Sequence, residues 1–317
     1  MLLSTAWDSF LALKEKDGIS AGVIKKYKLL RQRLEEFTEK HRVNYVSDCR
    51  LALLTEFRLT WKYGPRTTAK HLERLKSFFG FCAQRRWTAE DNPASELKAP
   101  KGAKDLCPTL PFTQAEMLKL LAACDAYETE VGPAGFLNAQ RLRTLILVMR
   151  YTGLRIGDAV NLSSESVSGD KVFLRTAKTG TEIYTVLPPD VVAALAATPR
   201  VTPTLYFWSG NGKLETATKD YESRLLRLLK LAGVSKGKNF MVSHRFRDTF
   251  AVDYLKTGRP IERLSILLGH SSVKVTERHY SPWTKSRQEQ LESDLRAMWD
   301  HQEQGTKQVQ VPNPRPN

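Results

Sequence analysis

The spacing of apolar residues is the feature that most constrains how this chain folds. Over most of the 317 residues they recur every three or four positions, as at Tyr27, Leu30 and Leu34, and this is the period of one face of an α-helix. Residues 171–175 and 182–187 differ, because they are rich in β-branched and aromatic side chains and flank a short turn. The pattern predicts a mainly α protein with one small antiparallel β-sheet, an α+β fold.

The helical pattern is interrupted once by a stretch without any apolar period. Residues 98–110 are rich in Pro, Gly and Lys, which is typical of a flexible basic linker. We therefore expect two domains, a helical one over residues 1–97 and a second over residues 111–300. The last residues, 301–317, are rich in Gln, Pro and Asn and are expected to be a disordered tail.

The second domain is expected to open with a capped helix. Thr113 and Glu116 have the spacing of a capping box directly before an apolar run. Beyond the β-rich segments and around them, further helices are expected at residues 139–151, near 191, and at 219–232, 244–257, 261–268, 273–280 and 285–300.

The chain is strongly basic. It has 49 Lys and Arg against 34 Asp and Glu, a formal net charge of +15, and such an excess favours a polyanionic partner such as nucleic acid. In the first domain the basic residues are interleaved with the apolar stripes, so these helices are candidates to lie along a DNA backbone. Solvated helix faces are the alternative. The candidate DNA-binding residues are Lys25, Lys26, Arg66, Lys70 and Arg74.

Other sequence features exclude several classes of protein. No run of about 18 uncharged apolar residues is present, so neither a membrane span nor export is expected. The four cysteines, Cys49, Cys82, Cys107 and Cys124, lack a CxxC pair, which indicates neither a zinc site nor a disulfide framework. We expect a cytoplasmic protein with reduced, mostly buried thiols, and without a metal or small-molecule cofactor.

Five short segments carry polar residues where core packing does not ask for them. Arg155 follows a Thr-Gly break, and Asp158 is placed to hold its guanidinium. His244 and Arg247 stand at i, i+3 on one expected helix, so that both reach one point. Taken singly, each has a structural explanation such as a cap or an amphipathic contact. The remaining segments are the turn with Lys178, the helix end with His270 and the end of a later helix with Tyr280.

Together these segments resemble the tyrosine recombinases, the family of phage and transposon integrases and chromosome-dimer resolvases. The match lies in the order and context of the residues and in the stretches SHRFRDTFAVDYL and LLGHSSVKVTERHY. It is strong over residues 113–300, whereas residues 1–100 match only in kind, as a helical core-site-binding domain. The resemblance implies six catalytic residues: Arg155, Lys178, His244, Arg247, His270 and Tyr280.

The resemblance also implies a mechanism. Tyr280 attacks a DNA phosphodiester to give a 3′-phosphotyrosyl link and a free 5′-hydroxyl, and rejoining needs neither metal nor ATP. Arg155 and Arg247 neutralise charge on the pentavalent phosphorus, and His270 adds a hydrogen bond.

Two proton transfers accompany this chemistry. His244 assists removal of the phenolic proton, because an imidazole titrates near neutrality. Lys178, on the hairpin, protonates the leaving 5′-oxygen.

The expected partners are a double-stranded DNA recombination site and further copies of the chain, as a dimer or tetramer on DNA. The helix at 285–300 places Leu291, Leu295, Met298 and Trp299 on one stripe. This stripe docks either on a neighbouring subunit or within its own domain.

Two rival functions fit parts of the pattern. A type IB topoisomerase uses similar chemistry but relaxes supercoils without a defined site. A DNA-binding regulator would use residues 264–280 as a helix-turn-helix and would not break DNA.

Overall fold

The computed structural model describes residues 1–89, 91–102, 110–130, 135–208, 210, 213–237 and 242–307. The chain divides into two compact units, Met1–Asp105 and Leu106–Asn317. Cys107 and residues 103–109 of the expected linker lie outside the described part. No helix in that part is both long enough and apolar enough to cross a membrane.

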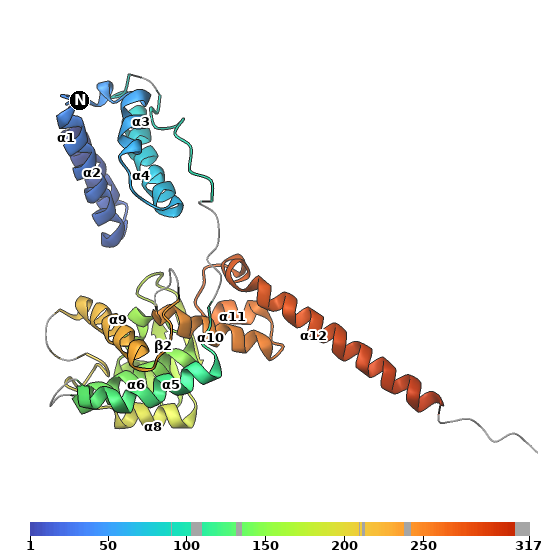
Figure 1. Ribbon diagram of the computed structural model, residues 1–317. Coiled ribbons are helices and arrows are strands. Elements are labelled where there is room, and N and C mark those ends of the chain that lie inside the picture. Colours follow the sequence, from blue (N-terminus) through green and yellow to red (C-terminus); the bar gives the residue numbers. More distant parts are fainter. Residues whose placement is uncertain are drawn as a thin grey trace, which may run out of the picture. The chain divides into compact units, whose positions relative to one another are not determined.

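The first unit is helical, as expected. Its core is aromatic, with the Trp7 ring stacked on Phe78 at 3.7 Å between centroids and the Phe10 ring set edge-on to both. The helices are α1 (Leu3–Lys16), α2 (Ala21–Lys40), the short 3-10 turn η1 (Val46–Asp48), α3 (Leu51–Leu59) and α4 (Pro65–Gln84) (Figure 1).

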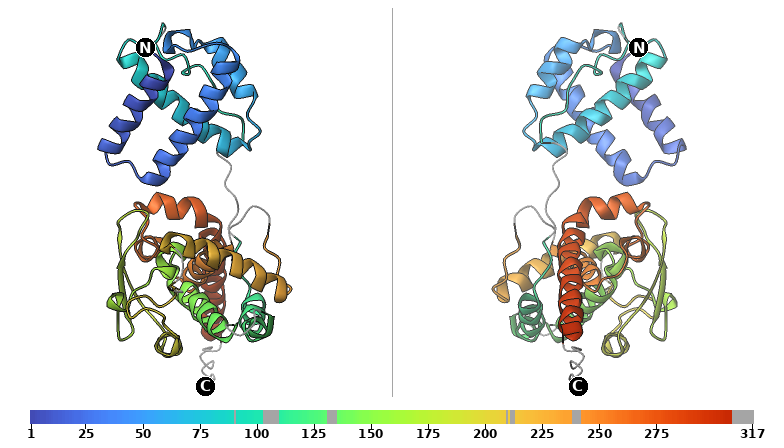
Figure 2. Two further views of the ribbon diagram at one scale, coloured as in Figure 1. Left: turned by 90° about the vertical axis from the view of Figure 1, so that its left-hand side faces the viewer. Right: turned by 90° about the vertical axis from the view of Figure 1, so that its right-hand side faces the viewer.

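The second unit combines helices with one small sheet, which confirms the predicted fold class. The sheet has the order β1-β2-β3 and is antiparallel throughout, and Figure 2 shows it at one edge of this unit. Its strands are β1 (Val167–Ser168), β2 (Lys171–Arg175) and β3 (Glu182–Val186). The helices are α5 (Gln114–Glu130), α6 (Gly135–Thr152), α7 (Ile156–Val160), the 3-10 turn η2 (Ser164–Ser166), α8 (Pro189–Ala197), α9 (Leu214–Leu231), α10 (Val242–Lys256), α11 (Ile261–Leu267) and α12 (Val273–Lys307).

The predicted capping box at the start of α5 is confirmed. The Thr113 backbone N–H donates to Glu116 Oε2 at 2.8 Å, and the Glu116 backbone N–H donates to Thr113 Oγ1 at 3.1 Å. Two amide groups that the first helical turn leaves without partners are thus satisfied.

Helix α10 lies at the centre of the second unit. It packs against α6, α9, α11 and α12. Its Phe246 belongs to the large core of the unit, whereas Ala251, Val252 and Leu255 belong to a smaller cluster shared with α11 and α12. Because apolar contacts hold both faces of α10, the polar side chains at its N-terminal end have a fixed position.

Two expectations about the C-terminal part are wrong. The separate helices at 273–280 and 285–300 form one helix, α12, which runs through Pro282. Proline removes one helical N–H, but Tyr280 and Trp283 on either side pack on the same apolar cluster and keep the helix continuous. The helix also includes residues 301–307 of the expected disordered tail, and residues 308–317 lie outside the described part.

The structure also locates three of the cysteines. Cys49, Cys82 and Cys124 are buried free thiols. Burial raises the pKa of each to about 12, so the thiols stay protonated at neutral pH.

Candidate active site

Arg247 is a buried cation on α10, with only 4% of its surface exposed. Its Nη1 donates to the Gly153 carbonyl at 2.7 Å, and its Nη2 donates to the Leu268 carbonyl at 2.6 Å. Gly153 directly follows α6 and Leu268 directly follows α11, so the C-terminal ends of two helices orient one guanidinium. Burial and the neighbouring Arg155 lower the pKa of Arg247 to about 10, which leaves it charged at neutral pH.

His270 lies in the segment between α11 and α12, at the helix end that the sequence predicted, and contacts Arg247 from there. Arg247 Nη2 lies 2.9 Å from His270 Nε2, and His270 Nδ1 lies 2.7 Å from Thr276 Oγ1. A guanidinium only donates, so Nε2 is the acceptor and the ring proton is on Nδ1. Burial and the charges of Arg247 and Arg155 lower the pKa of His270 to about 3, so the ring is neutral at pH 7.

Arg155 stands at the N-cap of α7, after a glycine that the backbone requires. Gly153 has φ +65°, and a Cβ there would come within 2.5 Å of Phe250 Cδ1. Arg155 lies close enough to Arg247 for its charge to lower the pKa of Arg247. Its Nη1 is buried and has no hydrogen-bond partner among the described residues. A buried guanidinium nitrogen without an acceptor is uncommon, and it fits a site that receives an anion.

Asp158 was expected to hold Arg155, but it contacts the hairpin instead. Its Oδ1 accepts the backbone N–H of Ala177 at 2.9 Å, while its Oδ2 is buried without a partner in the described part of the chain. The carboxylate lies on α7, whereas Ala177 is in the turn between β2 and β3. Asp158 therefore anchors the turn that carries Lys178, whose side chain is exposed.

His244 lies one turn before Arg247 on α10. Its side chain reaches the surface, yet its inner side packs against the protein. This partial burial, together with Arg247, Arg155 and Lys178, lowers the pKa of His244 to about 4. The imidazole is thus neutral at pH 7 and lies in the electrostatic field of three cations.

Tyr280 on α12 is buried, with 3% of its surface exposed, in the cluster formed with Leu255, Leu264 and Leu268. Its hydroxyl donates to Asp248 Oδ1 at 2.8 Å. Burial and the Asp248 carboxylate raise the pKa of the phenol, and the charges of Arg247 and Arg155 act in the opposite direction. Across the described residues, no hydrogen bond joins Tyr280 to His244.

The structure thus brings most of the predicted site residues into one electrostatic environment. The guanidinium groups influence both histidines and the phenol, and Lys178 influences His244. The site is rich in positive charge and in hydrogen-bond donors. Where the chain is described, no three His, Cys, Asp or Glu side chains are grouped so that they could hold a metal ion.

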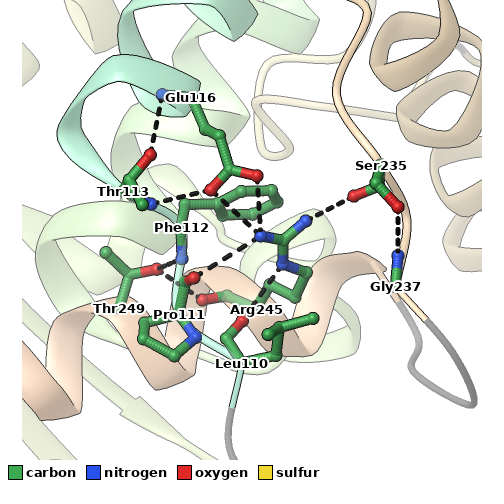
Figure 3. A network of polar contacts seen from close by, with 9 residues as sticks. All are labelled: Leu110, Pro111, Phe112, Thr113, Glu116, Ser235, Gly237, Arg245 and Thr249. Carbon is green, nitrogen blue, oxygen red and sulfur yellow. Dashed lines mark hydrogen bonds and ion pairs between the residues drawn. The ribbon is translucent and has the colours of Figure 1, made fainter.

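Arg245 was not predicted, but it ties α10 to the start of the second unit (Figure 3). Its guanidinium donates to the carbonyls of Leu110, Pro111 and Ser235 and to both oxygens of Glu116, and it stacks on the Phe112 ring at 3.8 Å. Thr249 Oγ1 accepts the Phe112 backbone N–H at 2.7 Å. These contacts hold the helix that carries His244 and Arg247, and no sequence signal distinguishes Arg245 from a surface arginine.

Asp248 and Thr276 were also missed. Asp248 on α10 accepts a hydrogen bond from Tyr280 on α12, and Thr276 on α12 is hydrogen-bonded to the His270 ring in the preceding loop. A polar residue next to Arg247 on a helix was the only available signal, and it does not identify a partner 32 residues away.

In the first unit, four of the five candidate DNA-binding residues line one hollow of about 340 Å³ between α2 and α4. These are Lys26, Arg66, Lys70 and Arg74. Lys25 lines a separate hollow with Lys28 and Glu15, because adjacent helical residues point about 100° apart. The basic hollow contains His71 as well, whose pKa is lowered by burial and by Arg74 and Arg33.

Known proteins resemble both the sequence and the fold. Tyrosine recombinase XerC of Chlamydia muridarum is 27% identical over 237 residues, which are 72% of this chain and 70% of the relative. A lambda integrase dimer bound to a COC′ core site matches with a TM-score of 0.68 and 17% identity, over 90% of this chain and 95% of the other. A lambda integrase tetramer bound to a Holliday junction matches with a TM-score of 0.66 and 18% identity, over 86% and 78%.

At these identities the solved structures show a shared fold. The profile of the phage integrase family matches residues 111–287, which is more than half of the chain and includes every predicted catalytic residue. The chain therefore belongs to the phage integrase family, the tyrosine recombinases.

Proposed function

We propose that this protein is a site-specific DNA recombinase of the integrase type, which cleaves and rejoins DNA through Tyr280. One observation carries the proposal: the buried Arg155 Nη1 has no partner among the described residues, and it shares an electrostatic environment with charged Arg247 and the Tyr280 phenol. A bound phosphodiester would supply the missing acceptor.

In the proposed reaction, Tyr280 Oη attacks the scissile phosphorus and the bond to the 5′-oxygen breaks. The product is a 3′-phosphotyrosyl link, which conserves the energy of the broken ester, so rejoining needs no ATP. Arg155 presents a planar fork of donors to the non-bridging oxygens, where charge accumulates in the transition state. Arg247 contributes its positive charge and those N–H groups that are not already bonded to Gly153, Leu268 and His270. These two cations supply charge stabilisation that other nucleases obtain from metal ions.

The two histidines have different tasks in this proposal. His270 acts as a positioning residue, because its Nε2 already accepts from Arg247 and fixes the guanidinium plane. His244 is neutral and reaches the surface beside the cations, so it donates an N–H to a phosphate oxygen. Lys178 protonates the leaving 5′-oxygen from the exposed hairpin turn.

The proposed partner is double-stranded DNA. The lambda integrase structures contain a dimer on a core site and a tetramer on a Holliday junction, and their fold is shared by this chain. We infer that the hollow lined by Lys26, Arg66, Lys70 and Arg74 binds backbone phosphates of the same duplex.

The chain also presents a surface suited to self-assembly. On α12, Leu291, Leu295, Met298 and Trp299 are each between 45% and 54% exposed. Such a stripe is stabilised by covering it with apolar surface, so we propose that it docks on a neighbouring subunit. Replacing Leu295 and Trp299 with Ser should then leave cleavage at a single site intact and prevent complexes that join two sites. Normal two-site complexes would contradict this assignment.

A denaturing gel tests the proposed function. The protein is incubated with nicked duplexes taken from the DNA that flanks its gene, so that cleavage releases a short strand and traps the intermediate. We expect a covalent adduct that is lost in Tyr280→Phe. Duplex binding without an adduct on any of these substrates would favour a regulator, and relaxation of plasmids irrespective of sequence would favour a topoisomerase.

A further inference from the structure

Asp248 is the group that touches the reacting oxygen of Tyr280. The phenolic hydroxyl donates to its Oδ1 at 2.8 Å, and the Tyr280 side chain packs in the apolar cluster with Leu255, Leu264 and Leu268. The backbone N–H of Leu110 also donates to the carboxylate. Asp248 is thus held from one side by the chain that enters the second unit and faces the nucleophile on the other.

Among the described residues, neither His270 nor His244 accepts a hydrogen bond from this hydroxyl. His270 has both ring nitrogens engaged, one with Arg247 and one with Thr276. His244 makes no hydrogen bond to Tyr280 in the described part of the structure. We propose that Asp248 is the proton acceptor for Tyr280, a catalytic residue in addition to the six that the family resemblance implies; this inference rests on the proposed function.

The charged groups around Asp248 fit this role. Arg247 on α10 and His279 on α12 face it, together with the Tyr280 phenol. Burial raises the pKa of the carboxyl, whereas burial and the carboxylate raise that of the phenol. In the resting enzyme the proton is on Tyr280, whose hydroxyl donates to Asp248 Oδ1. The phenolic hydroxyl becomes strongly acidic only as its oxygen bonds to phosphorus, and the proton then passes to Asp248.

The step balances without a further reactant. The bond from Tyr280 Oη to phosphorus forms, the bond from phosphorus to the 5′-oxygen breaks, and the phenolic proton ends on Asp248. The leaving 5′-oxygen receives its proton from Lys178. During rejoining the 5′-hydroxyl attacks phosphorus and returns its proton to Lys178. The bond from phosphorus to Tyr280 Oη breaks, and Asp248 returns its proton to the departing Tyr280 oxygen.

The test is the pH dependence of single-turnover cleavage on a nicked duplex that gives the wild-type adduct. Asp248→Asn keeps the shape and the hydrogen-bond acceptor but removes the base. At pH 7 we expect the cleavage rate of Asp248→Asn to be lower than that of wild type by a factor on the order of 10² to 10⁴. With increasing pH, the rate of this variant should rise about tenfold per pH unit, because solvent hydroxide replaces the base. Wild type should show no such rise over the same pH range.

Two further variants make the result specific. Asp248→Glu keeps a base and should recover part of the rate with a flat profile. Asp253→Asn is the matched control, because it removes another carboxylate from α10. Asp253 pairs with Arg150 and not with Tyr280, so this variant should cleave like wild type. Circular dichroism and duplex binding report whether each variant is folded.

Several outcomes would overturn the proposal. If Asp248→Asn cleaves as fast as wild type with the same pH profile, the carboxylate is not the base. If the steep dependence on pH appears in His244→Gln instead, His244 accepts the proton. These results differ from a failure of the proposed function, in which wild type forms no adduct that depends on Tyr280.

Discussion

At the scale of single residues, the contact between Arg247 and His270 has a cost that depends on pH. The folded protein holds His270 neutral, with its pKa lowered to about 3, because burial and two guanidinium groups oppose a further charge. The unfolded chain has no such environment, and its imidazole binds a proton near pH 6.5. Acid therefore favours the unfolded state through this residue.

His270 contributes stability that is fully present above pH 6.5 and is lost as pH falls toward its folded pKa. Between about pH 7.5 and pH 5 the loss from this one group is about 2 kcal/mol. His270→Gln, which does not titrate, should lose less stability over that interval by about this amount. Urea unfolding of the second unit at both pH values measures it, and an equal loss in both proteins would contradict the assigned protonation state.

Arg155 is expected to act on the transition state more than on binding. Arg155→Ala should reduce single-turnover cleavage on the order of 10²- to 10³-fold, because charge on the phosphorus is greatest during the reaction. Arg155→Lys keeps the charge but loses the fork of donors, so it should recover only part of the rate. Duplex affinity, measured in parallel by fluorescence anisotropy, should change much less. A loss of affinity as large as the loss of rate would make Arg155 a binding residue.

At the scale of elements, the sequence predicted what local periodicity determines. The positions of α10, α11 and the β2-β3 hairpin follow from apolar spacing within each segment. The partners of Asp158 and Asp248 did not follow, because each contact joins two elements whose approach depends on the whole packed core. The same limit explains α12, where tertiary packing on both sides of Pro282 outweighs the local preference to end a helix.

Asp158 is expected to order the turn between β2 and β3. Asp158→Ala removes the acceptor for the Ala177 N–H, so residues 176–181 should exchange their amide hydrogens faster. Because Lys178 lies in this turn, the cleavage rate should fall roughly tenfold, which corresponds to a rise of about 1.4 kcal/mol in the activation free energy. Asp158→Asn retains an acceptor and serves as the matched control. Unchanged exchange in Asp158→Ala would show that the contact does not order the turn.

At the scale of the whole molecule, basic residues occur in both units, but only some share a surface. The sequence grouped Lys25 with Lys26, and the structure separates them into different hollows. Charge counts alone do not resolve this, since the direction of each side chain depends on the helix it belongs to. We therefore expect DNA binding at the hollow lined by Lys26, Arg66, Lys70 and Arg74, and not at Lys25.

Lys26→Ala should weaken duplex binding and lower the slope of log affinity against log salt by about 1, as expected for the loss of one phosphate contact. Lys28→Ala is the matched control, because it lies on the same helix in the other hollow and pairs with Glu15 at 3.2 Å. Filter binding across a salt series measures both variants. Equal salt slopes for Lys26→Ala and wild type would remove the hollow from the DNA-binding surface.

The central claim is that the Tyr280 phenol is the nucleophile of the site built around Arg155 and Arg247. Its most direct test is mass spectrometry of the covalent adduct after digestion with trypsin and nuclease. We expect a nucleotide attached through its 3′-phosphate to the peptide of residues 279–285, whose one tyrosine is Tyr280. A nucleotide attached to any other peptide, or linked through a 5′-phosphate, would contradict it.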